Sequence, residues 1–210
     1  MNANQFVDEY RAARASAILR THDQDVAREA MTAAVAGGFR VIEFTLSIPG
    51  ANELIAEFSQ RAGLIVGAGT VLTVNDARAS AAAGASFLVS PVVDELVIEE
   101  AQRLGLAVMP GCSTPTEMLR AYRAGAQLQK LFPAPGTGPA WVKQTLGPLP
   151  FLKIVPTSGV TLENAAAFWQ AGAHALGFVA SLFPEADLTA RRFDVIQSRA
   201  QQMLAAVQQA

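Results

Sequence analysis

The sequence is poor in the side chains that usually form disulfides and metal sites. Its 210 residues include one cysteine, Cys112, and two histidines, His22 and His174. A single cysteine excludes an internal disulfide, which fits a reducing compartment. Two histidines without clustered acids or thiols do not make a metal site. We therefore expect no bound metal and no other cofactor.

Charge is also scarce. Charged residues make up 16% of the chain, and the formal net charge is −2. This balance offers neither a basic surface for nucleic acid nor a polybasic patch for a membrane. Residues 1–10 carry acids and lack the apolar core of a signal peptide, and no apolar run is as long as a transmembrane helix. We expect a cytoplasmic protein that binds neither nucleic acid nor membrane.

Apolar residues, by contrast, make up 51% of the chain and follow a repeat. Ala-rich helical stretches end at a glycine, for example in the Ala-Gly-Ala segments 83–85, 124–126 and 171–173, and a short apolar strand follows each. Uniformly apolar strands are typical of parallel strands covered on both faces. The predicted strands are 16–20, 40–46, 64–67, 86–90, 106–109, 127–132, 151–155 and 174–179.

Alternating strands and helices predict an α/β fold, a single (β/α)₈ TIM barrel over residues 1–210 with an extra N-terminal helix. A doubly wound open sheet is the alternative. It would usually carry a glycine-rich turn after the first strand, where this chain has Arg20-Thr-His-Asp. The predicted helices include 5–13, 23–36, 51–61, 74–83, 94–104 and 190–208.

Two ionisable residues lie inside predicted strands, where burial would change their chemistry. Lys130 is near the end of strand six. Poor solvation lowers a lysine pKa and frees an amine that can form a Schiff base, although the side chain could instead extend its ammonium to the surface. Glu43 is the only acid inside a predicted strand. Burial would raise its pKa and make it a proton shuttle, unless it forms a structural ion pair.

Further polar residues stand where predicted strands end, which is where barrel enzymes carry their chemistry. Arg20 ends strand one and offers a fork for a carboxylate or phosphate, or else is a surface arginine. Thr45 shares the strand face of Glu43, and Thr70 follows the glycine-rich end of strand three. The turns after strands seven and eight predict an anion site. These turns contain Ser158, Gly159, Val179, Ala180 and Ser181.

Taken in order, these segments resemble the class I aldolases that cleave 2-keto-3-deoxy-6-phosphogluconate and 4-hydroxy-2-oxoglutarate. The resemblance extends from about residue 15 to 183. The segments that carry it are Ala17-Ile-Leu-Arg20, Ile42-Glu-Phe-Thr45, Val66-Gly-Ala-Gly-Thr-Val71, Val89-Ser-Pro91, Met109-Pro-Gly111, Leu128-Gln-Lys-Leu-Phe-Pro133 and Val155-Pro-Thr-Ser-Gly159.

The resemblance implies roles for individual residues. Lys130 matches the Schiff-base lysine that holds pyruvate, and Glu43 matches the acid/base carboxylate. Thr70 and Thr157 match residues around the bound keto acid, and Pro91 matches a pocket wall. The family needs no metal because the iminium itself is the electron sink, and it typically forms homotrimers around a small keto-acid substrate.

Three positions depart from the family pattern. Ser47 stands where the best-known members have an arginine for the keto-acid carboxylate, and Arg20 is the candidate replacement. Ser158 interrupts the usual Thr-Gly-Gly turn. Val179-Ala180 replaces a Gly-Ser pair, so Ser181 would supply a hydroxyl only if its loop were shifted. The substrate is therefore expected to be phosphorylated and bound differently, or to be shorter or unphosphorylated.

Other functions remain compatible with a barrel of this kind. One is a different enzyme, such as a phosphate-sugar isomerase or an oxo-acid decarboxylase. Another is a non-catalytic barrel that binds a keto acid and uses Lys130 structurally. A degenerate binder has no need for two buried charged groups, which are costly to retain, so Lys130 and Glu43 together favour the aldolase.

Overall fold

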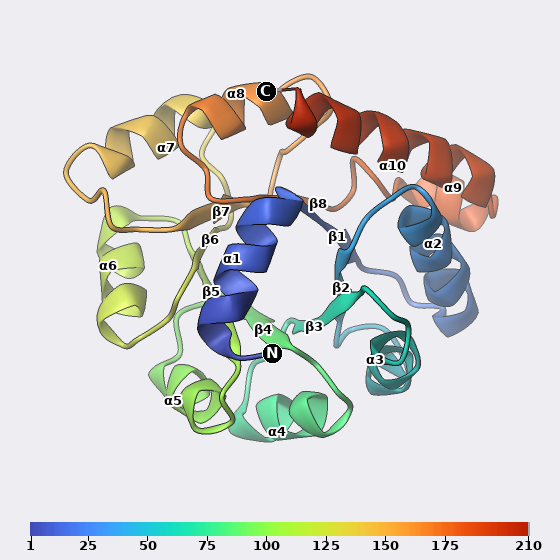
Figure 1. Cartoon of the computed structure of the whole chain (residues 1–210), viewed down its shortest axis with the longest axis horizontal. Coiled ribbons are helices and arrows are strands. Elements are labelled where there is room, and N and C mark those ends of the chain that lie inside the picture. The colour runs from blue at the N-terminus through green and yellow to red at the C-terminus, as the bar shows by residue number, and fades with distance from the viewer. Residues whose placement is uncertain (210) are drawn as a thin grey trace.

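The computed structural model describes residues 1–209, which form a ring of parallel strands surrounded by helices (Figure 1). The sheet order is β7-β6-β5-β4-β3-β2-β1-β8, and the N–H of His174 donates to the carbonyl of Ile154 across the remaining gap, at 2.8 Å. This is the predicted (β/α)₈ barrel. The strands are β1 (Ala15–Leu19), β2 (Val41–Thr45), β3 (Ile65–Gly69), β4 (Phe87–Ser90), β5 (Ala107–Cys112), β6 (Gln129–Leu131), β7 (Ile154–Pro156) and β8 (Leu176–Phe178).

The helices with predicted bounds begin and end within a few residues of those bounds, and side-chain caps fix the first turn of α1, α2, α4, α5 and α6. Thr114, for example, forms a capping box with Glu117 at the start of α6. The short α9 was not predicted, since five residues are too few to show a helical period. The helices are α1 (Ala3–Ala13), α2 (Gln24–Ala36), α3 (Ala51–Ser59), α4 (Val74–Ala82), α5 (Glu95–Arg103), α6 (Pro115–Arg123), α7 (Pro139–Leu146), α8 (Ala165–Gln170), α9 (Glu185–Thr189) and α10 (Phe193–Gln208). Within residues 1–209, none of them has the length and apolarity needed to cross a membrane.

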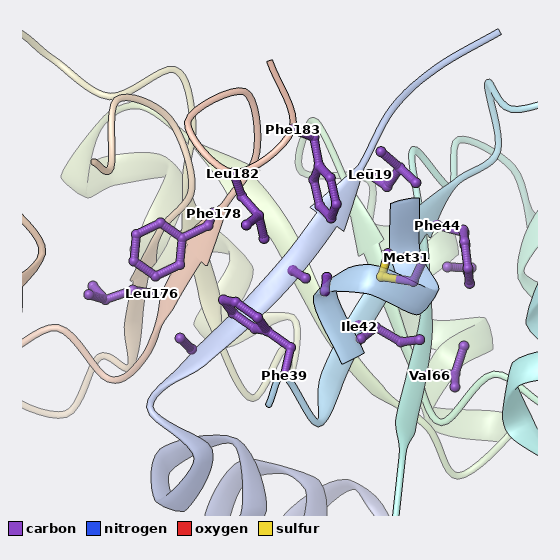
Figure 2. Close-up of a cluster of buried hydrophobic side chains, with 14 of the residues drawn as sticks. Leu19, Met31, Phe39, Ile42, Phe44, Val66, Leu176, Phe178, Leu182 and Phe183 are labelled. Carbon is purple, nitrogen blue, oxygen red and sulfur yellow. The ribbon is translucent and has the colours of Figure 1, made fainter. Parts of the chain in front are cut away.

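A continuous apolar layer joins the strands to the surrounding helices. Figure 2 shows part of it, where Ile42 and Phe44 of β2 and Phe178 of β8 lie near Met31 of α2 and Phe39. These strand residues point outward, and their sequence neighbours point into the barrel. Both faces are therefore buried, which explains why the strands are apolar without alternation.

The helix α1 covers the N-terminal end of the barrel, and it crosses the centre of the ring in Figure 1. Its Phe6 stacks on Phe87 of β4, with ring centroids 4.4 Å apart. Its Tyr10 hydroxyl shares a 2.6 Å hydrogen bond with Ser16 of β1. These side chains form an apolar cluster with residues near the starts of the strands, such as Val41 and Leu128. A ligand can therefore enter the barrel only from the opposite end, where the strands finish.

Candidate active site

Lys130 lies on the inner face of β6 with only 8% of its surface exposed. Its neighbours in register are Gly111 of β5 and Val155 of β7, and its Nζ lies 5.1 Å from the ring centre of Phe132. No residue among 1–209 hydrogen-bonds to its side chain or pairs with it within 4.0 Å. Burial lowers the pKa of Lys130, the charge of Glu43 partly opposes this, and Arg20 lowers the pKa further. The site thus increases the fraction of free amine at neutral pH.

Glu43 lies on the inner face of β2 and is 1% exposed. Both of its carboxyl oxygens are buried and have no hydrogen-bond partner within the described part of the chain. Burial raises the pKa of Glu43, whereas the positive charges of Lys130 and Arg20 lower it. No ion pair in residues 1–209 includes Glu43, so the structural ion pair that the sequence left open is not found. A buried carboxyl without a protein partner has its oxygens available for a substrate or a water molecule.

A cavity of about 540 Å³, here called the main cavity, opens at the C-terminal ends of β1, β2, β6, β7 and β8. Lys130 and Arg20 both line it, and the exposed Arg20 lies at its rim. This volume is within the usual range for a small-molecule site. The predicted site residues that line the cavity are Arg20, Thr45, Lys130, Thr157, Ser158, Gly159, Val179, Ala180 and Ser181.

Three of the predicted residues, Glu43, Thr70 and Pro91, are not among the residues that line the cavity. The Thr70 hydroxyl accepts a long 3.4 Å hydrogen bond from Arg20, and its backbone has a positive φ of 61°. The carbonyl of Pro91 packs so closely on Gly111 that a Cβ at Gly111 would overlap it. Because Gly111 is next to Lys130 in register, and residues in register share a strand face, the Pro91 carbonyl lies on the same inner face as Lys130.

Some of the hydroxyl groups around the cavity already form hydrogen bonds within the protein, and one does not. Ser181 lines the cavity together with Val179 and Ala180, but its hydroxyl already donates to the carbonyl of Val160 at 2.7 Å. Thr45 shares a 2.8 Å hydrogen bond with Ser47. The Thr157 hydroxyl is buried and has no partner in residues 1–209. Thr157 therefore offers the cavity an unused hydrogen-bonding group.

Sequence reasoning missed several lining residues, of which Phe132 and Ile18 are the most informative. Phe132 stands two positions after Lys130, and Ile18 two positions before Arg20. Because side chains alternate along a strand, residues two apart share a face. The spacing alone could therefore have indicated both as walls of the site. The other missed lining residues are Val160 and Thr161.

The remaining candidate groups lie away from the cavity. Lys143 and Lys153 are exposed, and His174 contacts the carbonyl of Val7 at 3.0 Å near α1. Burial raises the pKa of the Cys112 thiol to about 12, so this side chain packs rather than reacts. In residues 1–209 no three His, Cys, Asp or Glu side chains gather in a way that could hold a metal ion.

Comparisons with known proteins identify the family of the chain. The family model of KDPG and KHG aldolase matches residues 7–198. The chain belongs to this family. It is accordingly an aldolase, a carbon–carbon lyase.

Several relatives of this aldolase have named activities. The 2-dehydro-3-deoxy-6-phosphogalactonate aldolase of Escherichia coli is 35% identical over 170 residues, which cover 80% of this chain and 83% of that protein. The 2-dehydro-3-deoxy-phosphogluconate aldolase of Treponema pallidum is 38% identical over 138 residues, which cover 65% and 66%.

Solved structures show the same architecture. A structure described as native KDPGal is 30% identical, covers 93% of this chain and 94% of its own, and superposes with a TM-score of 0.85. A 2-keto-3-deoxy-6-phosphogluconate aldolase of Zymomonas mobilis, solved with 3-phosphoglycerate, is 28% identical and covers 95% of both chains, with a TM-score of 0.81. The aldolase barrel thus extends over nearly the whole chain.

Proposed function

We propose that this aldolase works through a Schiff base on Lys130 and a proton shuttle at Glu43. The observation that carries the proposal is the buried Lys130 amine at the open end of the barrel, in the electrostatic field of a buried carboxyl with no protein partner. A neutral amine and a carboxyl of raised pKa are the two groups that imine chemistry needs near neutral pH.

The substrate that fits this chemistry is a 3-deoxy-2-keto sugar acid. The Lys130 amine adds to the C2 carbonyl, and loss of water gives an iminium that withdraws electrons from C3. Arg20 at the cavity rim is the natural partner of the C1 carboxylate, because Ser47 cannot supply the positive charge. The unpartnered Thr157 hydroxyl can hydrogen-bond the same end of the substrate.

Cleavage requires removal of the C4 hydroxyl proton. Glu43, or a water molecule that it orients, accepts this proton as the C3–C4 bond breaks and the bonding electrons move into the enamine. The aldehyde leaves, C3 is protonated, and water hydrolyses the iminium to release pyruvate and restore the Lys130 amine. Positioned proton transfer of this kind is worth about 10²–10⁴ in rate.

We further propose 2-keto-3-deoxy-6-phosphogluconate as the principal substrate, with glyceraldehyde 3-phosphate as the aldehyde product. The relatives are named for phosphorylated sugar acids, and a six-carbon acid suits a cavity of about 540 Å³. Cleavage of 4-hydroxy-2-oxoglutarate uses the same bond changes and is the expected side activity. The single, buried Cys112 is compatible with the cytoplasm, where we place the enzyme.

A homotrimer is the proposed assembly. Leu72, Val92 and Leu96 are exposed on the segments that follow the neighbouring strands β3 and β4, and Leu96 is 66% exposed. Exposed apolar side chains on neighbouring segments are typical of protein interfaces. A 29% identical neighbour, which this chain covers over 72% of its length, is a designed cage made by fusing symmetric oligomeric domains.

Trapping of pyruvate tests the Schiff base directly. The enzyme is incubated with pyruvate and borohydride, digested and analysed by mass spectrometry. We expect a reduced pyruvate adduct on Lys130 that is absent from Lys130→Met. The matched control is Lys143→Met, because Lys143 is exposed on α7 and should not affect the adduct. Absence of an adduct in the wild-type enzyme at saturating pyruvate would reject the mechanism.

A further inference from the structure

A second cavity, here called the side cavity, lies beside the main cavity and has a volume of about 680 Å³. It is lined by the turn after β1 and by residues of α9 and its flanking segments. The two cavities have Ile18, Arg20, Val179 and Ala180 in common. The two cavities therefore adjoin at these residues, and a substrate bound to Lys130 would have to extend past them to place its far end in the side cavity.

The far end of the main cavity lacks positive side chains. The lining residues of the β7 and β8 turns, 157–161 and 179–181, include no lysine, arginine or histidine. The cations of the main cavity are Lys130 and Arg20, and both are engaged at the reacting end in the mechanism above. A phosphate held only by these turns would keep most of its charge uncompensated by side chains.

The side cavity supplies the missing positive charge through Arg191, together with the polar ring of His22. Neither side chain makes a hydrogen bond to any of residues 1–209. The nearest carboxylate oxygen to the Arg191 guanidinium belongs to Asp23, at a distance of 3.9 Å, and the other Asp23 oxygen already accepts from the N–H of Val26. Arg191 therefore retains nearly all of its donors for a ligand.

The backbone of Arg191 supports a specific placement. Its φ is 52°, a left-handed conformation that is uncommon for residues other than glycine. Backbone hydrogen bonds hold this segment, from the N–H of Arg191 to the carbonyl of Leu188 and from the N–H of Arg192 to the carbonyl of Asp187.

The side cavity also carries negative charge. Asp23 and Glu185 line it, so the positive charges of Arg20 and Arg191 are balanced when no anion is bound.

We propose that the side cavity binds the terminal phosphate of the substrate, with Arg191 as the main contact and His22 as a second donor. This inference rests on the proposed function, because it assumes a phosphorylated sugar acid anchored at Lys130. A guanidinium fork matches phosphate oxygens with two parallel hydrogen bonds. Specificity for phosphorylated substrates would then come from the turn after β1 and from the segment that follows α9. Val179 and Ala180 would form the wall along which the carbon chain of the substrate lies.

The test compares kcat/KM for 2-keto-3-deoxy-6-phosphogluconate with that for unphosphorylated 2-keto-3-deoxygluconate. In Arg191→Gln we expect the ratio of the two values to fall about tenfold or more, mainly through KM for the phosphorylated acid. In Arg191→Lys this ratio should fall less, because lysine keeps the positive charge but cannot form the two parallel hydrogen bonds of a guanidinium. Arg123→Gln is the matched control, since Arg123 lies on α6 outside both cavities.

Each other outcome has a defined meaning. An unchanged ratio in both Arg191 variants overturns the inference. If Ser158→Ala lowers the ratio and Arg191→Gln does not, the phosphate binds at the β7 turn instead. A wild-type enzyme without preference for the phosphorylated acid also overturns it, while pyruvate trapping at Lys130 still stands. Failure of that trapping in the wild-type enzyme would reject the mechanism itself.

Discussion

At the scale of single residues, the site depends on three charges that influence one another. Burial is the largest influence on both groups that are proposed to react, raising the pKa of Glu43 and lowering that of Lys130. Arg20 is exposed at the rim and lowers the pKa of both, because a nearby cation favours a carboxylate and disfavours an ammonium. If Arg20 binds the substrate carboxylate as proposed, substrate binding will also change the pKa of Lys130 and of Glu43.

Neutral substitutions of the two neighbours should shift the Lys130 pKa in opposite directions. Glu43→Gln removes a negative charge that stabilises the ammonium, so the midpoint of pyruvate trapping against pH should move to lower pH. Arg20→Gln removes a positive charge that destabilises it, so the midpoint should move to higher pH. The measurement is the trapping rate at saturating pyruvate across pH, with Arg123→Gln as control. Shifts of the same sign would contradict this electrostatic account.

Gly69 controls the position of the Glu43 carboxyl. A Cβ at Gly69 would overlap Oε1 of Glu43, so Gly69→Ala must displace the carboxyl. We expect kcat for aldol cleavage to fall about 10²-fold, as misplacement by about 1 Å typically costs. Pyruvate trapping at Lys130 should continue, because that step does not need the shuttle.

Gly136→Ala is the control for this substitution, since a Cβ at Gly136 would meet no atom within 4 Å. An equal loss of cleavage in both variants would mean that the effect is not specific to Glu43. Loss of trapping together with cleavage in Gly69→Ala would point to a distorted barrel instead.

At the scale of elements, α1 separates the two ends of the barrel. Phe6 and Tyr10 fill the N-terminal end against Phe87, and Tyr10 bonds to Ser16 of β1. This helix fills the barrel interior at the N-terminal ends of the strands, so the main cavity is confined to their C-terminal ends. The helix thus supports the site without contributing a residue to the lining of the main cavity.

Removing the aromatic contact of α1 should destabilise the whole barrel. Phe6 is fully buried, so Phe6→Ala should lower the free energy of unfolding by about 3–5 kcal/mol. Phe151→Ala is the control, because Phe151 is 44% exposed and should cost much less. Urea unfolding followed by circular dichroism measures both. Similar losses of unfolding free energy in the two variants would show that the Phe6 contact of α1 does not stabilise the barrel.

At the scale of the whole molecule, the exposed side chains Leu72, Val92 and Leu96 provide a test of the proposed trimer. Leu96→Glu places a charge in this apolar surface and should convert the trimer to monomers, as measured by light scattering after size exclusion. Phe151→Glu, at an exposed apolar site outside this surface, should leave the mass unchanged. A monomeric wild-type enzyme would reject the trimer, and a trimeric Leu96→Glu would reject only this surface.

The sequence predicted all eight strands because each is a short, uniformly apolar run, and a glycine stop precedes most of them. It predicted Lys130 and Glu43 because charged residues are rare inside buried strands and must be compensated. It did not predict α9, which is too short to show a period, and it missed Phe132 and Ile18, whose apolar side chains look like any other part of a core. The sequence could not show that the Ser181 hydroxyl, although Ser181 lines the cavity, already donates to the carbonyl of Val160.

What the sequence determined by itself was therefore the order of the elements and the two residues proposed to react, since both follow from local patterns of burial and charge. Only the tertiary structure decided which atoms are free. It showed that the Ser181 hydroxyl donates a hydrogen bond to Val160, whereas the side-chain oxygens of Thr157 and Glu43 have no hydrogen-bond partner in residues 1–209. It also showed that Arg20 lines two adjoining cavities. These facts depend on contacts between residues far apart in the chain, and such contacts form only when the barrel closes.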